Sequence, residues 1–170
     1  MKIAVLSDIH DNVWKLDSAL KALGGADAMI CCGDLCSPFV IHQLGRGFAK
    51  PIHIVFGNND GDLFRIAHNA RSHEHIRIHG EWFRGEFGGR KFAANHYDNI
   101  SRAVAASGEF DVVCYGHNHR FDVSRIGRTL AINPGSIMGA TFGPAAERID
   151  VPSTYVIYDT ETDSAERFEA

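Results

Sequence analysis

Five short apolar segments in this chain each run directly into side chains that can bind a metal ion. The segments and the donors after them are 3–6 with Asp8 and His10, 28–32 with Asp34, 52–56 with Asn58, 92–94 with His96, and 112–115 with His117 and His119. Unbroken apolar runs with β-branched members are typical of buried parallel strands. Because ligand sites of open α/β sheets lie beyond the carboxyl ends of such strands, the pattern predicts one shared site at that edge.

The segments between the first strands have the spacing of amphipathic helices. Apolar residues recur every three or four positions over 13–23, where Asp11 or Asn12 is placed to cap the amino end. Residues 38–48 and 63–71 also favour short helices. Right-handed crossovers through such helices lay successive strands side by side and parallel, which predicts an α/β fold.

The pattern changes after residue 75. Segments 76–78, 81–87 and 90–94 alternate or are amphipathic, and Gly88-Gly89 marks a hairpin turn between the last two. We therefore expect antiparallel strands joined to the parallel set, either in one mixed sheet or in a second packed sheet.

The last third of the chain continues this mixture. A helix is expected over 100–106, before the strand at 111–115. Further alternating segments at 121–126, 129–132 and 153–158 predict strands, and 161–169 predicts a last edge strand. The segment 133–151 is expected to be the longest irregular loop, placed to form a lid or rim.

Composition restricts the function classes. The 170 residues suit a single domain, 1–170, and the net charge of -4 argues against a general nucleic-acid surface. No apolar stretch is long enough for a membrane span, and no leader-like segment opens the sequence. The four cysteines lack paired metal-site spacing, so we expect reduced, packed thiols and a cytoplasmic location.

Five motifs together resemble the calcineurin-like metallophosphoesterase superfamily. They are Asp8-x-His10, Gly33-Asp34, Gly57-Asn58-x-Asp60, His96 and Gly116-His117-x-His119, in that order. The short length and the motif Asn133-Pro-Gly-Ser136 are similar to the small bacterial and archaeal phosphodiesterases of the YfcE/MJ0936 family. The resemblance implies a four-layer α/β/β/α sandwich, in which two mixed β-sheets are flanked by helices.

The resemblance also implies a pair of divalent metal ions. One ion would be held by Asp8, His10, Asp34 and His119, and the other by Asp34, Asn58, His96 and His117. Oxygen and imidazole donors without thiolate suit Mn, which we expect first, or Fe, Ni or Zn. Two such ions lower the pKa of a bridging water, so that the resulting hydroxide can attack phosphorus. The implied catalytic residues are Asp34, Asn58 and His117.

Two positions depart from the superfamily pattern. Asn59 stands where many members carry a histidine that acts as general acid or steadies the transition state. An amide cannot act as the acid, so we expect either substrates with good leaving groups or a proton from water or another side chain. Tyr97 replaces the usual glycine after His96, and it either narrows the cleft, stacks on a nucleobase or packs its own loop.

Other polar residues near the motifs each have alternative predicted roles. Arg120 and Arg148 could reach a phosphate oxygen or remain surface charges, and we assign substrate binding to Asn59 and Arg120. Asp60 could orient Asn59 or a metal-bound water, or it could cap the following helix.

The sequence therefore predicts a divalent-metal-dependent phosphodiesterase that acts on a small phosphodiester or nucleotide. One alternative is a phosphomonoesterase or dinucleoside polyphosphate hydrolase on the same fold. Another is a protein-binding scaffold like the retromer subunit Vps29, which would require an impaired metal site. Members of the family are commonly dimers or larger, so a homodimer or higher homo-oligomer is expected.

Overall fold

The computed structural model describes residues 1–170 and contains two main sheets with four α-helices. The helices are α1 (Val13–Ala22), α2 (Val40–Gly47), α3 (Leu63–Ala70) and α4 (Asp98–Ser107), with a short 3-10 turn η1 (Leu23–Gly25). Asn12, one of the two expected capping residues, caps α1 by accepting a hydrogen bond from the backbone N–H of Lys15.

The first sheet has six strands in the order β13-β12-β1-β2-β3-β4. Its strands are β1 (Lys2–Leu6), β2 (Ala28–Cys31), β3 (Ile52–Ile54), β4 (Ile76–Ile78), β12 (Thr154–Asp159) and β13 (Ser164–Glu169). Strands β1 to β4 are parallel, whereas β12 pairs antiparallel with β1, and β13 pairs antiparallel with β12 at the edge of the sheet. The edge strand expected at the carboxyl end is therefore confirmed.

The second sheet has five strands in the order β5-β6-β7-β9-β8. Its strands are β5 (Phe83–Phe87), β6 (Arg90–Ala94), β7 (Val112–Cys114), β8 (Phe121–Ile126) and β9 (Thr129–Pro134). The hairpin predicted at Gly88-Gly89 joins β5 to β6, and β6 then pairs in parallel with β7. Both sheets are consequently mixed.

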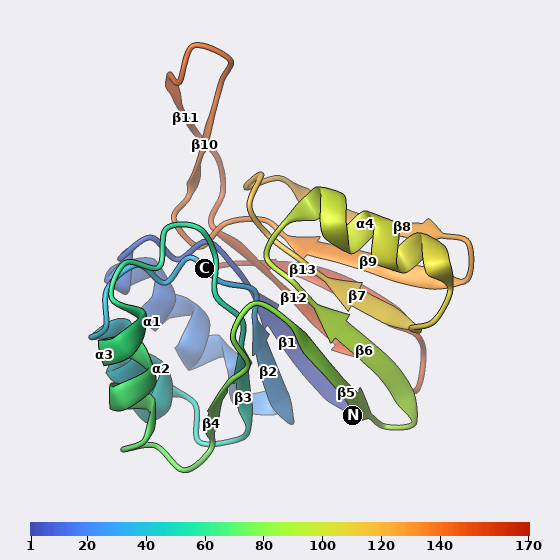
Figure 1. The fold of residues 1–170 in the computed structure, drawn as a ribbon, viewed down its shortest axis with the longest axis horizontal. Coiled ribbons are helices and arrows are strands. Elements are labelled where there is room, and N and C mark those ends of the chain that lie inside the picture. Colours follow the sequence, from blue (N-terminus) through green and yellow to red (C-terminus); the bar gives the residue numbers. More distant parts are fainter.

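Three layers of buried side chains hold these elements together. In β1, Ala4 and Leu6 pack towards the helices α1 to α3, whereas Ile3 and Val5 pack between the two sheets. A smaller apolar cluster lies under α4, on the outer face of the second sheet. The order of layers is helices, sheet, sheet and helix, as Figure 1 shows, and it confirms the expected four-layer α/β/β/α sandwich.

Two local expectations are wrong. Strand β4 pairs with β3 in parallel, not antiparallel, because the chain returns to the same sheet through α3. The segment 133–151 is not wholly irregular, because β10 (Ala140–Phe142) and β11 (Arg148–Asp150) pair as an antiparallel hairpin. This hairpin projects from the body of the molecule in Figure 1.

No helix is long and apolar enough to cross a lipid bilayer. All four cysteines are free, and three of them, Cys31, Cys32 and Cys114, are buried in or directly after strands. The expectation of packed, reduced thiols agrees with this arrangement.

Candidate metal centre

The predicted donors gather where the carboxyl ends of strands from both sheets meet. The six-stranded sheet supplies Asp8, His10, Asp34 and Asn58 from the loops after β1, β2 and β3, and the five-stranded sheet supplies His96, His117 and His119 from the loops after β6 and β7. The structure thus brings all seven side chains into one region, arranged as two groups that share Asp34.

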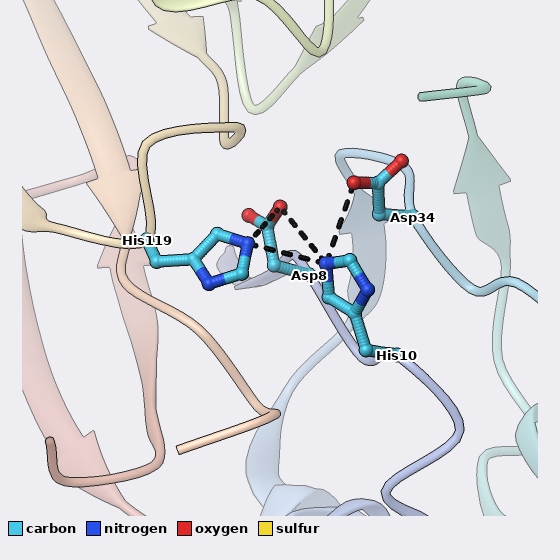
Figure 2. Close-up of side chains that lie close together, drawn as sticks. All are labelled: Asp8, His10, Asp34 and His119. Atoms are coloured by element: carbon cyan, nitrogen blue, oxygen red, sulfur yellow. Dashed lines mark hydrogen bonds and ion pairs between the residues drawn. The ribbon is translucent and has the colours of Figure 1, made fainter. Parts of the chain in front are cut away.

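The first group consists of Asp8, His10, Asp34 and His119. One ligand atom from each lies within 4.8 Å of all the others. His10 Nε2 is 3.1 Å from His119 Nε2 and 3.4 Å from Asp34 Oδ2, and His119 Nε2 is 3.3 Å from Asp8 Oδ1. The four side chains point towards a common centre in Figure 2.

The second group consists of Asp34, Asn58, His96 and His117. His96 Nε2 lies 3.4 Å from Asp34 Oδ2 and 3.1 Å from Asn58 Oδ1. His117 Nδ1 lies 2.9 Å from the same amide oxygen. Because His10 and His96 both approach Asp34 Oδ2, this carboxylate oxygen stands between the two groups, in the position of a shared ligand.

Backbone carbonyls set the tautomers of two histidines. His96 Nδ1 donates to the carbonyl of Cys32 and His119 Nδ1 donates to that of Ala140, both at 2.7 Å. Since a carbonyl only accepts, Nδ1 carries the hydrogen in each ring, and in the neutral ring Nε2 presents a lone pair. Such an outer hydrogen bond is the usual orientation device of metal-binding histidines.

The atoms that face one another within each donor group are therefore mostly hydrogen-bond acceptors. The Nε2 lone pair of His96 faces two oxygens, and that of His119 faces a carboxylate and a second imidazole. Acceptors this close together need either a hydrogen or a metal ion between them. The donor set, of carboxylate, amide and imidazole without thiolate, fits a divalent cation of the Mn, Fe, Ni or Zn class.

The close packing of these side chains also shifts several of their pKa values. Burial lowers the pKa of His96 and His119, but the hydrogen bonds and negative charges of Asp34 and Asp8 outweigh it, so both pKa values are raised. For His10, burial dominates and its pKa is lowered. Burial raises the pKa of Asp34, yet His96 and Asn59 outweigh this and hold the pKa well below its usual range.

Strained backbone accompanies these donors. Five of the seven, namely Asp8, His10, Asp34, His117 and His119, have positive φ values between 44° and 72°. Non-glycine residues seldom adopt this left-handed conformation, which costs energy and concentrates at functional sites. All five residues lie in the loops that follow β1, β2 and β7.

At two glycines of the motifs, the backbone lies directly against a carboxylate of the site. A Cβ at Gly57 would collide with Asp34 Oδ1, and one at Gly116 would collide with Ser7 Oγ and Asp8 Oδ2. A larger residue at either position would therefore displace a carboxylate of the site.

The two sides of the centre differ in exposure. Asp8, Asp34 and His96 are almost completely buried, whereas Asn58, Asn59 and His117 are exposed. The centre is therefore open to a ligand on the Asn58 and His117 side. The side chain of Arg120 is exposed and makes no hydrogen bond or ion pair, so its predicted contact with substrate stays a prediction.

Asn59 has a structural partner of its own. Its backbone N–H donates to Asp34 Oδ1 and its side-chain amide donates to Asp34 Oδ2, each at 2.8 Å. The substrate contact predicted for Asn59 also stays a prediction, while its contact with Asp34 is one that the sequence pattern did not indicate.

Asp60 and Cys36 contact the residues of the centre without belonging to either donor group. The buried carboxylate of Asp60 accepts backbone N–H groups from Asp34, Cys36 and Gly57, at 3.1, 3.0 and 2.7 Å. It does not cap α3, because Asp62 does so. Cys36 Sγ lies 3.4 Å from His10 Nδ1, and nothing in the sequence indicated this contact.

Comparison with known proteins agrees with this geometry. Residues 1–163 match the calcineurin-like phosphoesterase superfamily domain. The chain belongs to this family. It is 30% identical over 147 residues to phosphodiesterase MJ0936 of Methanocaldococcus jannaschii, a stretch that covers 84% of this chain and 88% of the relative.

Solved structures show the same fold. A structure described as a novel archaeal phosphodiesterase superposes with a TM-score of 0.87 and 27% identity, with both chains covered completely. Vps29 from Entamoeba histolytica has a TM-score of 0.68 and 18% identity over 100% of this chain and 99% of its own. The phosphoesterase Yfce of E. coli has a TM-score of 0.62 and 19% identity, over 99% of each chain. The last two likenesses show the fold alone.

Proposed function

We propose that this protein is a divalent-metal-dependent phosphodiesterase that hydrolyses a small phosphodiester or nucleotide. The observation that carries the proposal is the pair of donor groups sharing Asp34 Oδ2, buried on one side and exposed on the other. The 30% identity to a phosphodiesterase over most of the chain supports the reaction class.

Two ions would fit the two groups. Asp8, His10, Asp34 and His119 would hold one, and Asp34, Asn58, His96 and His117 the other, with Mn expected first. When bound, such ions supply a nucleophile from water at neutral pH and neutralise charge on the phosphate. The chain itself holds the anionic Asp34 between the groups and leaves His117 and Asn58 exposed, next to the arriving phosphate.

The departing alcohol receives no proton from position 59. The Asn59 amide is engaged with Asp34, and an amide does not act as a general acid. We therefore propose a preference for diesters with good leaving groups. Arg120, which is exposed and unpaired, would contact an outer phosphate oxygen.

A substrate screen tests this function. Purified protein with added Mn²⁺ is assayed on cyclic nucleotides, model diesters and matched monoesters, with and without a chelator. Diester turnover that the chelator abolishes is the expected result. Asp34→Asn, which removes the shared anion, should reduce turnover by at least roughly a hundredfold.

A matched control keeps the Asp34→Asn result interpretable. Asp17→Asn makes the same change on the exposed face of α1, where Asp17 pairs only with Lys21, and it should retain full activity. Substantial turnover by Asp34→Asn would contradict the proposal. Faster hydrolysis of monoesters or dinucleoside polyphosphates would favour the first alternative reading.

The scaffold reading predicts a different result. It requires protein that binds well under one Mn²⁺ per chain and cleaves no diester, although all seven donor positions carry competent side chains. Sedimentation of the same sample measures the expected homo-oligomeric state. A cytoplasmic location, with its reducing conditions, suits the four free thiols.

A further inference from the structure

The hairpin of β10 and β11 is the one projecting part of the fold, and its base is fixed to the metal centre. The Ala140 carbonyl accepts the hydrogen bond from His119 Nδ1, and the Met138 N–H donates to the Asp8 carbonyl at 2.9 Å. The Val151 N–H closes the base by donating to Gly139 O at 3.1 Å. The position of the hairpin relative to the donors is therefore defined by hydrogen bonds.

An aromatic ring stands where the hairpin leaves the centre. The ring of Phe142 lies 6.0 Å from that of His119, with an interplanar angle of 62°. Its side chain is nevertheless 48% exposed, although His119 beside it is buried. One surface of the ring contacts His119 and the remainder is open to a ligand.

The strand register adds a cation beside this ring. Phe142 pairs directly with Arg148, so both side chains lie on the same face of the hairpin. Arg148 Nε donates to Asp150 Oδ1 at 3.0 Å, and Asp150 lies on the same face of the hairpin. Ile149 pairs with Thr141 and lies on the opposite face.

A second aromatic ring borders the other donor group. Tyr97 lies 5.1 Å from the ring of His117 and 5.3 Å from that of His96. Each donor group thus has an aromatic neighbour, Phe142 beside His119 and Tyr97 beside His117.

We propose that Phe142 and Arg148 form a binding subsite for an ester arm that carries a nucleobase. This inference rests on the proposed function and narrows its substrate class to nucleoside phosphodiesters. A planar base would stack on the exposed part of the Phe142 ring, and the guanidinium would lie next to polar edges of the base. Stacking on an aromatic residue is sequence-tolerant, so one base is not strongly preferred over another.

Two substrates with the same leaving group test the subsite. The p-nitrophenyl ester of thymidine monophosphate has a nucleoside arm, whereas methyl p-nitrophenyl phosphate has none. Phe142→Ala should lower kcat/KM on the nucleoside ester relative to the methyl ester on the order of tenfold, mainly through KM. Phe142→Leu, which keeps the apolar surface without the ring, should lose most of the same preference.

Ile149→Ala is the matched control, because Ile149 is 45% exposed on the opposite face of the same hairpin. It should leave the ratio of the two kcat/KM values unchanged. An equal change in this ratio for Ile149→Ala would overturn the proposal, since the effect would then come from the hairpin as a whole. Equal losses on both substrates for Phe142→Ala would also overturn it.

Binding measurements separate this proposal from the proposed function. Calorimetry of the Mn²⁺-loaded protein should show tighter binding of thymidine monophosphate than of methyl phosphate, and Phe142→Ala should remove the difference while keeping Mn²⁺ affinity. Absence of any diester turnover would contradict the function, whereas equal binding of the two phosphates would contradict the subsite. If Phe142→Ala instead dissociates an oligomer and leaves the substrate ratio intact, the face contacts a second copy and the proposal fails.

Discussion

Asn59 donates a hydrogen bond to each carboxylate oxygen of Asp34. Its backbone N–H donates to Oδ1 and its side-chain amide donates to Oδ2, each at 2.8 Å. The residue that lacks the expected imidazole thus orients the carboxylate that the two donor groups share. The amide also helps to hold the pKa of Asp34 well below its usual range.

Asn59→Ala should weaken Mn²⁺ binding by about threefold to tenfold, because one of the two donors that orient Asp34 is lost while the backbone N–H remains. Titration calorimetry of the metal-free variant measures this affinity directly. An unchanged dissociation constant would show that the amide does not orient the carboxylate.

Asn59→His should mainly accelerate diesters with poor leaving groups. A general acid contributes about 100- to 10,000-fold where the leaving alcohol needs a proton, and little where it does not. The comparison is between kcat/KM for a p-nitrophenyl diester and for an alkyl diester. If the ratio of these two values stays as in the wild type, the missing imidazole does not limit the substrate range.

Asp60→Asn should destabilise the fold by about 2–3 kcal/mol, because one amide oxygen cannot replace a carboxylate that accepts three backbone N–H groups. Urea unfolding measures the loss. Asp62→Asn is the control with the same chemical change, since asparagine caps a helix as well as aspartate does. Comparable losses in the two variants would contradict the role given to Asp60.

Gly116→Ala should impair the metal centre without unfolding the protein. The new methyl group would meet Ser7 Oγ and Asp8 Oδ2, so Asp8 must move and Mn²⁺ affinity should fall by at least roughly tenfold. Gly24→Ala introduces the same methyl group where no atom lies within 4 Å, and it should bind Mn²⁺ like the wild type. Normal affinity in Gly116→Ala would show that the loop adapts freely.

His53 should make stability depend on pH. Its Nδ1 lies 3.0 Å from His79 Nε2 and its ring packs on Phe83 and Phe87. Burial lowers the pKa of His53 to about 4, and His79 and Arg77 add to the effect. Since the unfolded side chain titrates near 6.5, the unfolded state gains a proton first, and stability falls as the pH drops from 6.5 towards 4.

Urea unfolding at about pH 7 and about pH 4.5 measures the free energy of unfolding at each pH. His53 should account for roughly 1–2 kcal/mol of the decrease between them, a value that is reduced because its side chain is partly exposed. His53→Phe keeps an aromatic ring that cannot titrate, so its loss of stability over the same range should be smaller. An identical loss in both proteins would exclude His53 as a source.

The positions of the donors were predictable because each follows an apolar run that parallel pairing must bury. The direction of β4 was not, since a three-residue strand of alternating pattern, Ile76–Ile78, carries no signal for parallel or antiparallel pairing. The β10 and β11 hairpin was missed for a different reason. Phe142 and Ile149 lie on opposite faces and are both exposed, so no burial pattern marks the strands.

The supporting contacts were also beyond prediction from the sequence. Asp60 lies next to a turn and before a helix, where a capping role is an equally sound expectation, and only the fold brings the N–H groups of Asp34 and Cys36 to it. The contact between Cys36 and His10 likewise depends on the meeting of two loops that are 26 residues apart.

The donors are divided between the two sheets, and His10 and His119, although adjacent in space, are 109 residues apart in the chain. A cation bound among them would act as a crosslink between the amino-terminal and carboxyl-terminal halves of the molecule. Loading would then raise the free energy of unfolding, by about 2.7 kcal/mol when the metal exceeds its dissociation constant a hundredfold. Loss of such a cation would then also shorten the lifetime of the folded chain against proteases.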